Sequence, residues 1–203
     1  MKTQNFEREL PSGYKQVKYI NAKDKKFGII FNLIAVAVLA VVMLIAVLPL
    51  MSAEVEYEYN STKSFVAWGV FLLLMVLYIV LHEIVHGIAY KALTGERLTF
   101  GISWSCAFCG VPNVYTYRRT ALIALVSPLV VFTLIFVPLT VFLFYVDVVY
   151  YLFSAVLLGM HLGGCSGDIY CTILFLFKYK DKKTLLRDTG PEQYYYVYDQ
   201  TND

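Results

Sequence analysis

The chain has 203 residues, of which 59% are hydrophobic and 16% charged, and its formal net charge is +2. This composition is too apolar for an ordinary soluble globular domain. We therefore predict one polytopic domain whose surroundings are a lipid bilayer, and we expect no nucleic-acid partner.

Four apolar segments are long enough to cross a membrane as helices. They cover residues 27–51, 65–90, 120–146 and 148–177. The chain is thus predicted to be an all-α polytopic membrane protein with a small cytosolic-side β-hairpin or sheet. Residues 1–26 form an N-terminal segment, 27–177 a four-helix transmembrane domain, and 178–203 a C-terminal tail.

The distribution of charge predicts the orientation of these spans. Residues 1–26 hold seven Lys/Arg against three acidic residues, whereas residues 52–64 hold Glu54, Glu56 and Glu58 against one lysine. The central loop and the start of the tail are again basic. By the positive-inside rule, both termini and the central loop are cytosolic. We expect a multi-pass integral membrane protein, located in the plasma membrane if the source is bacterial.

The second span ends in the motif His82-Glu83-Ile84-Val85-His86, after an uncharged run from Phe65 to Leu81. A charged side chain at mid-bilayer costs roughly 2.5–3.5 kcal/mol, so ionisable groups at this depth indicate function. On a helix, His82 and His86 lie one turn apart on the same face and can bind one metal ion. Glu83 is then placed to act as general base on a metal-activated water and to protonate the leaving amine.

The loop at residues 94–119 alternates apolar and aromatic side chains between glycines and a proline. This pattern predicts a β-hairpin against the membrane surface. The hairpin could offer an edge to which a substrate peptide adds a strand, or it could be an amphipathic cover over the site. Residues 13–21 and 194–198 are also prone to form strands. They could join the hairpin sheet, and 194–198 could equally be an interfacial aromatic anchor.

Cys106 and Cys109 form a CxxC pair in this loop. A redox pair and half of a zinc site are the functional interpretations. The other half of a zinc site is absent from the sequence, and a cytosolic loop is in a reducing environment. Two ordinary buried thiols are therefore favoured.

The third and fourth spans supply the remaining candidates. Pro128 and Pro138 are predicted to kink the third span. In the fourth span, the run 163–167 (GGCSG) weakens the helix just before Asp168 and lets that carboxylate turn inward. Asp168 is the leading candidate for a third metal ligand, although the glycines also suit close helix packing. His161 could be another ligand, a stabiliser of the oxyanion, or a core histidine with its hydrogen bonds satisfied.

The sequence resembles the site-2 protease class of intramembrane zinc metalloproteases, and more closely the DUF3267-type putative zincin peptidases. The resemblance rests on HEIVHG at residues 82–87, the loop after it, Ser127-Pro128 in the next span, and Gly167-Asp168 in the last. It implies that His82, His86 and Asp168 bind Zn²⁺ and that Glu83 is the catalytic acid/base. Where such families have an asparagine upstream of the aspartate, this chain has His161.

The expected function is that of a zinc-dependent intramembrane endopeptidase, a metalloprotease that hydrolyses a peptide bond of a membrane-protein or peptide substrate near the cytosolic face. The alternative is a non-proteolytic membrane protein whose zinc site serves structure or binds a partner peptide. A metal or proton transporter is a third hypothesis, which four spans without inverted repeats disfavour. A His₂-carboxylate set can also hold iron, but HExxH on one helix favours zinc.

Overall fold

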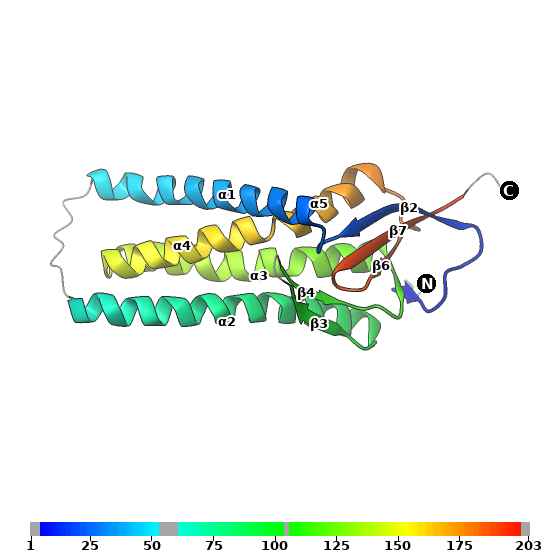
Figure 1. The fold of residues 1–203 in the computed structure, drawn as a ribbon, viewed down its shortest axis with the longest axis horizontal. Coiled ribbons are helices and arrows are strands. Elements are labelled where there is room, and N and C mark those ends of the chain that lie inside the picture. Colours follow the sequence, from blue (N-terminus) through cyan, green and yellow to red (C-terminus); the bar gives the residue numbers. More distant parts are fainter. Residues whose placement is uncertain (1–4, 53–60, 104–105, 200–203) are drawn as a thin grey trace. The chain divides into compact units, whose positions relative to one another are not determined.

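The computed structural model describes residues 5–52, 61–103 and 106–199, and its α-helices and most of its strands are labelled in Figure 1. They fall into two compact units. Unit 1 comprises Met1–Ile30, Leu81–Pro128 and Gly167–Asp203, and unit 2 comprises Phe31–Val80 and Leu129–Ser166. The three glutamates that orient the first loop, and residues 104–105 in the predicted hairpin, lie outside the described residues.

Four helical stretches in the described part of the chain are long and apolar enough to cross a membrane. The helices are α1 (Lys25–Ser52), α2 (Ser61–Thr94), α3 (Arg118–Phe144), α4 (Val148–Gly164) and α5 (Ser166–Ile173), and α5 continues into a π-helix, η1 (Leu174–Lys178). The four predicted helical segments are confirmed. The fourth is divided at Cys165, where the glycine-rich run was expected to weaken it.

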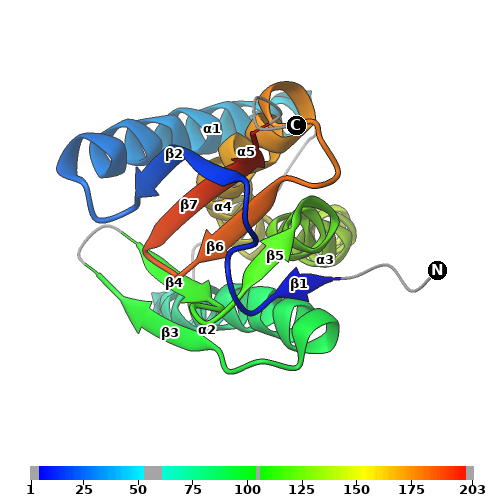
Figure 2. The same ribbon diagram turned by 90° about the vertical axis from the view of Figure 1, so that its right-hand side faces the viewer.

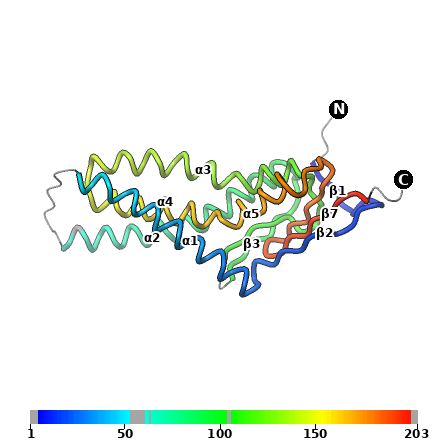
Figure 3. The backbone as a smooth tube through the Cα atoms, turned by 90° about the horizontal axis from the view of Figure 1, so that it is seen from above, coloured from blue at the N-terminus to red at the C-terminus, as the bar shows by residue number. Residues whose placement is uncertain are grey.

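In unit 2, parts of α1 to α4 run alongside one another as a helix bundle (Figure 3). Asp147 begins α4, because its carboxylate accepts hydrogen bonds from the N–H groups of Val149 and Tyr150. Gly163 allows close packing, since a Cβ there would lie 2.8 Å from the Cα of Ala35. Gly163 therefore serves close helix packing, which was the other role expected for the glycine-rich run 163–167.

The outer surface of this bundle is strongly apolar. Leu44, Leu73 and Leu134 are 65%, 67% and 71% exposed. Contiguous apolar surface of this kind is unfavourable in water and favourable against lipid tails. The exposure pattern is the one expected of membrane-spanning helices.

Unit 1 contains a five-stranded antiparallel sheet in the order β1-β5-β6-β7-β2 (Figure 2). Its strands are β1 (Phe6–Glu7), β2 (Tyr14–Asn21), β5 (Tyr115–Tyr117), β6 (Leu185–Asp188) and β7 (Glu192–Tyr198). The two strand-prone terminal segments are thus strands, and they pair with each other, Tyr14 opposite Tyr198 and Asn21 opposite Glu192. Aromatic and β-branched side chains in β7 favour this extended backbone.

One face of the sheet packs on helices of the same unit. Tyr195 and Leu186, from neighbouring strands, are fully buried. They share a core cluster with Leu125 of α3 and with Cys171 and Phe175 at the end of the fourth span. This core fixes α3 and α5 against the sheet.

The loop after α2 forms the predicted hairpin, β3 (Thr99–Ile102) paired with β4 (Ala107–Gly110). The prediction that the terminal strands join it is wrong, because the hairpin is a separate two-stranded sheet. The end of β4 instead approaches the β6–β7 turn through backbone, where a Cβ on Gly110 would lie 2.1 Å from the amide nitrogen of Gly190. Only glycine at position 110 permits this approach.

Candidate metal centre

Helix α2 presents His82 and His86 one turn apart, and both side chains are buried. Their ring centroids lie 5.0 Å apart. The helix ends shortly afterwards with Gly95 in the left-handed region at φ +70, and the N–H of Gly95 donates to the carbonyl of Lys91. The two imidazoles therefore belong to the last turns of a well-terminated helix.

Asp168 lies in the first turn of α5, directly after the interruption at Cys165. Its Oδ2 atom is 3.4 Å from Nε2 of His82 and 3.4 Å from Nε2 of His86. All three side chains lie within unit 1. The structure thus brings together the three residues predicted to be ligands, which we call the His-His-Asp group.

The spacing of this group can be compared with the dimensions of a zinc site. Ligand atoms about 2.0–2.1 Å from a tetrahedral zinc ion lie about 3.3–3.4 Å from one another. The two Nε2-to-Oδ2 separations of 3.4 Å match that edge. They are longer than the usual N–H···O distance of about 2.9 Å. The group therefore fits zinc in size and in chemistry.

The ring of His86 is oriented by a second contact. Its Nδ1 atom lies 2.8 Å from the backbone carbonyl oxygen of Ala124 in α3. A carbonyl only accepts, so Nδ1 carries a proton, and Nε2 is the ring nitrogen left to face Asp168 or a bound metal ion. This is the arrangement that metal-binding histidines commonly have.

Glu83 is half-buried and immediately follows the first histidine. Its charge acts on Cys109 of β4, so the hairpin lies near the site. Burial raises the pKa of the Cys109 thiol to about 12, and the negative charges of Glu83 and Asp188 act in the same direction. Cys109 is therefore a protonated thiol at neutral pH. Cys109 is buried, whereas Cys106 is half-buried, so the prediction of two buried thiols holds for Cys109 alone.

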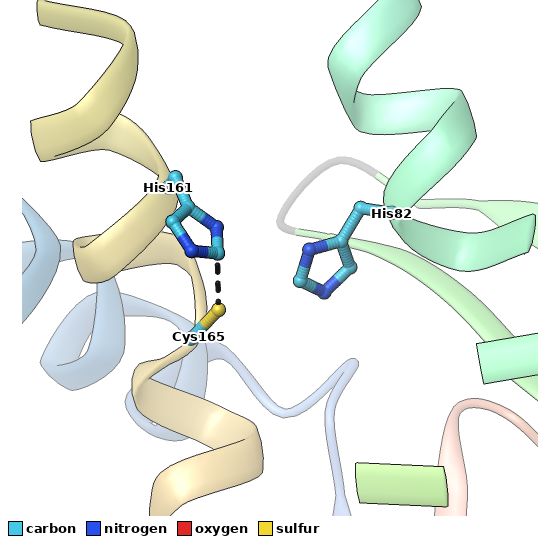
Figure 4. Close-up of side chains that lie close together, drawn as sticks. All are labelled: His82, His161 and Cys165. Carbon is cyan, nitrogen blue, oxygen red and sulfur yellow. Dashed lines mark hydrogen bonds between the residues drawn. The ribbon is translucent and has the colours of Figure 1, made fainter. Parts of the chain in front are cut away.

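His161 lies in unit 2 and is fully buried. Its Nε2 atom is 3.0 Å from the hydroxyl of Thr133, and its Nδ1 atom is 3.1 Å from the hydroxyl of Tyr78. Figure 4 shows its further contact with Cys165, whose sulfur lies 3.7 Å from Nδ1. These contacts are those of a core histidine with satisfied hydrogen bonds. A role for His161 at an oxyanion stays a prediction.

Asp188 lies in the segment predicted to be the C-terminal tail, but the structure buries it. Asp188 ends β6 and is 3% exposed. It accepts hydrogen bonds from the hydroxyl of Tyr90, one turn beyond His86, and from the N–H of Gly190. Burial raises the pKa of its carboxyl to about 6, against the lowering effect of these two donors. The Asp188-Thr189-Gly190 sequence signals a turn, and no local pattern signals burial.

The sequence model of the DUF3267 family, described as putative zincin peptidase, matches residues 74–183, more than half of the chain. The matched range contains Glu83 and the whole His-His-Asp group. It ends before Asp188. No curated protein and no solved structure gives a significant match.

Proposed function

The chain belongs to the DUF3267 family of putative zincin peptidases, and on this premise we propose that it is a zinc-dependent endopeptidase of the membrane. Its substrate would be a membrane protein or peptide, cut near the cytosolic face. The observation that carries this proposal is the His-His-Asp group, with two Nε2 atoms each 3.4 Å from one carboxylate oxygen. Glu83, beside the first histidine, completes the set needed for hydrolysis.

The residues of the site have separate roles in this proposal. His82, His86 and Asp168 would hold zinc, which when bound lowers the pKa of water towards about 7 and polarises a carbonyl group. Glu83 accepts a proton from the attacking water and delivers it to the departing amine nitrogen. The carbonyl of Ala124 keeps the proton of His86 on Nδ1.

The helices that hold the site support a cut near the cytosolic face. The motif ends the uncharged run of α2, and Asp168 lies late in the fourth apolar stretch, Val148–Lys178. Both ends lie on the side of the basic central loop and tail, which the positive-inside rule assigns to the cytosol. A substrate helix would have to unwind locally before its backbone could reach Glu83.

The alternative is a zinc-binding membrane protein without peptidase activity. A structural zinc site normally has four protein ligands, whereas a catalytic site has three and one open position. The His-His-Asp group has three members. This count favours the catalytic proposal.

The deciding experiment compares wild type with Glu83→Gln in nanodiscs. Each protein is assayed for zinc content and for cleavage of a panel of single-span membrane proteins, with cut sites assigned by mass spectrometry. We expect about one zinc in both proteins. Loss of the general base should reduce cleavage by about 100-fold or more.

Glu96→Gln is the matched control, because Glu96 is a loop residue that pairs with Arg8. It should retain both zinc and cleavage. Cleavage that survives Glu83→Gln would contradict the mechanism. Zinc in wild type with no cut in any substrate tested under conditions that support other membrane peptidases would favour the binding-protein alternative.

A further inference from the structure

In an ordinary helix, the carbonyl that orients His86 would already accept a hydrogen bond from the helix backbone. Within an α-helix, each carbonyl accepts a hydrogen bond from the N–H four residues later. The carbonyl of Ala124 in α3 would therefore be occupied by the N–H of residue 128. It instead lies 2.8 Å from Nδ1 of His86 in another helix.

Residue 128 is a proline, which has no N–H. Helix α3 continues through this position, from Arg118 to Phe144. The proline thus removes one donor from the helical ladder without ending the helix. The carbonyl left without its helical partner is the one that accepts from His86.

We propose that Pro128 is a positioning residue of the zinc site, which keeps the Ala124 carbonyl free to orient His86. This inference rests on the proposed function, because it assigns a role relative to the metal. With any other residue at position 128, a backbone N–H would compete for the same oxygen. His86 would then have to share the acceptor that keeps a proton on Nδ1 and turns Nε2 towards the metal position.

The packing around Ala124 leaves His86 few other acceptors if a backbone N–H competes for this carbonyl. Pro128 is buried, and Ala124 is fully buried in a cluster with Tyr90, Val111 and Val114. Tyr90 lies one turn beyond His86 on α2, so this cluster holds the two helices together at the level of the hydrogen bond. The packing leaves His86 little freedom to find a different acceptor.

A proline that served only to kink α3 would make a different prediction. Its replacement would restore a helical hydrogen bond and leave the metal site intact. Removing proline from a helix interior is expected to preserve or increase the stability of the helix. A fall in metal affinity without a fall in thermal stability is therefore the signature of the positioning role.

The test compares Pro128→Ala with Pro138→Ala in the full chain. Both substitutions restore an N–H to α3, but Pro138 is exposed and lies ten residues further along the helix. Zinc affinity of the metal-free proteins is measured by competition with a chromogenic chelator. The ligand field is followed through the visible absorption spectrum after Co²⁺ is added, and thermal unfolding is measured without metal.

We expect Pro128→Ala to bind zinc about 10–100-fold more weakly, in line with the loss of a group that orients a ligand. Its Co²⁺ spectrum should differ from wild type, and its melting temperature should not fall. Pro138→Ala should match wild type in affinity and spectrum. An ester at position 128, introduced as the α-hydroxy analogue of alanine, also lacks the N–H and should restore affinity.

The outcomes separate this inference from the proposed function. Wild type that binds no zinc would overturn both. Zinc bound by wild type and by Pro128→Ala with equal affinity would overturn the positioning role alone. If Pro128→Ala does not fold, Pro128→Leu takes its place, because leucine fills more of the buried space and also supplies the N–H.

Discussion

Two of the three buried histidines, His86 in unit 1 and His161 in unit 2, have different hydrogen-bonding arrangements. In unit 1, His86 has a carbonyl oxygen at Nδ1 and a carboxylate oxygen at Nε2. In unit 2, His161 has a hydroxyl at each ring nitrogen. A hydroxyl both donates and accepts, so the tautomer of His161 can adjust to its partners. The carbonyl at His86 only accepts, and it fixes the proton.

The side chains around the two rings also differ in charge. The rings of Tyr78, Phe132 and Phe136 lie within 6 Å of the His161 ring, centroid to centroid. These are uncharged neighbours that suit a neutral imidazole in a bundle core. His86 shares its unit with Asp168 and the buried Asp188. Burial alone therefore does not separate the two histidines, whereas their partners at Nε2, a carboxylate for His86 and a hydroxyl for His161, do.

The largest expected effect is the loss of metal from His86→Ala. Removing one of the three proposed ligands should weaken zinc binding on the order of 1,000-fold or more, since each ligand would contribute several kcal/mol. The measurement is zinc retained after dialysis against a weak chelator. His161→Ala is the matched control and should retain its zinc. Loss of zinc from His161→Ala would place that histidine among the ligands and remove the distinction drawn here.

The same control variant should lose stability. His161→Ala leaves a cavity in the bundle and deprives the hydroxyls of Tyr78 and Thr133 of a partner. We expect destabilisation by about 2–4 kcal/mol. Thermal unfolding of the metal-free protein in detergent measures it. An unchanged melting temperature would show that His161 is not a structural histidine.

The sequence predicts those parts of the site that depend on local periodicity. The uncharged run before His82 indicates a helix, and the four-residue spacing then places His86 on the same face. The glycine-rich run before Asp168 marks the position at which the fourth span is divided. Each of these inferences uses only the stretch of sequence that adjoins the site residue.

What the sequence does not predict depends on pairing between distant segments. Asp188 ends a strand, β6, that pairs with β5, some seventy residues earlier, and Tyr90 reaches it from α2. The contact at His86 is a backbone carbonyl, whose availability is set by a proline in another helix. Neither feature has a local pattern, so both required the three-dimensional structure.

Asp188 should make the stability of unit 1 depend on pH. Unit 2 has no buried carboxyl among the described residues, since its buried polar side chains there are Thr140, Ser154 and His161. Burial raises the pKa of Asp188 to about 6, whereas an unfolded aspartate has a value of about 3.9. The folded state then binds more protons between these values, so stability falls as pH rises from about 4 to about 6 and is constant above. The two-unit shift corresponds to about 3 kcal/mol at most.

Asp188→Asn should remove this slope. Thermal unfolding of the metal-free protein from pH 4.5 to 7.5 measures it, with chelator present so that metal release does not contribute. Asp199→Asn is a suitable control, because Asp199 pairs with Lys15 at the edge of the sheet. Equal slopes in wild type and Asp188→Asn would show that the buried carboxyl is not the source.

The smallest effects concern the two hydroxyls that hold His161. Thr133→Val and Tyr78→Phe each keep the size of the side chain and remove one hydrogen-bonding group, so each should destabilise the metal-free protein by about 1 kcal/mol. Thr133→Val should have the larger effect, because Nδ1 retains the sulfur of Cys165 at 3.7 Å after Tyr78→Phe. Sulfur is only a weak partner, so the difference between the two melting temperatures should be small. The reverse order would mean that the phenol of Tyr78, and not the threonine, fixes the tautomer of His161. The proton of His161 would then be fixed by the partner at one ring nitrogen, as it is in His86.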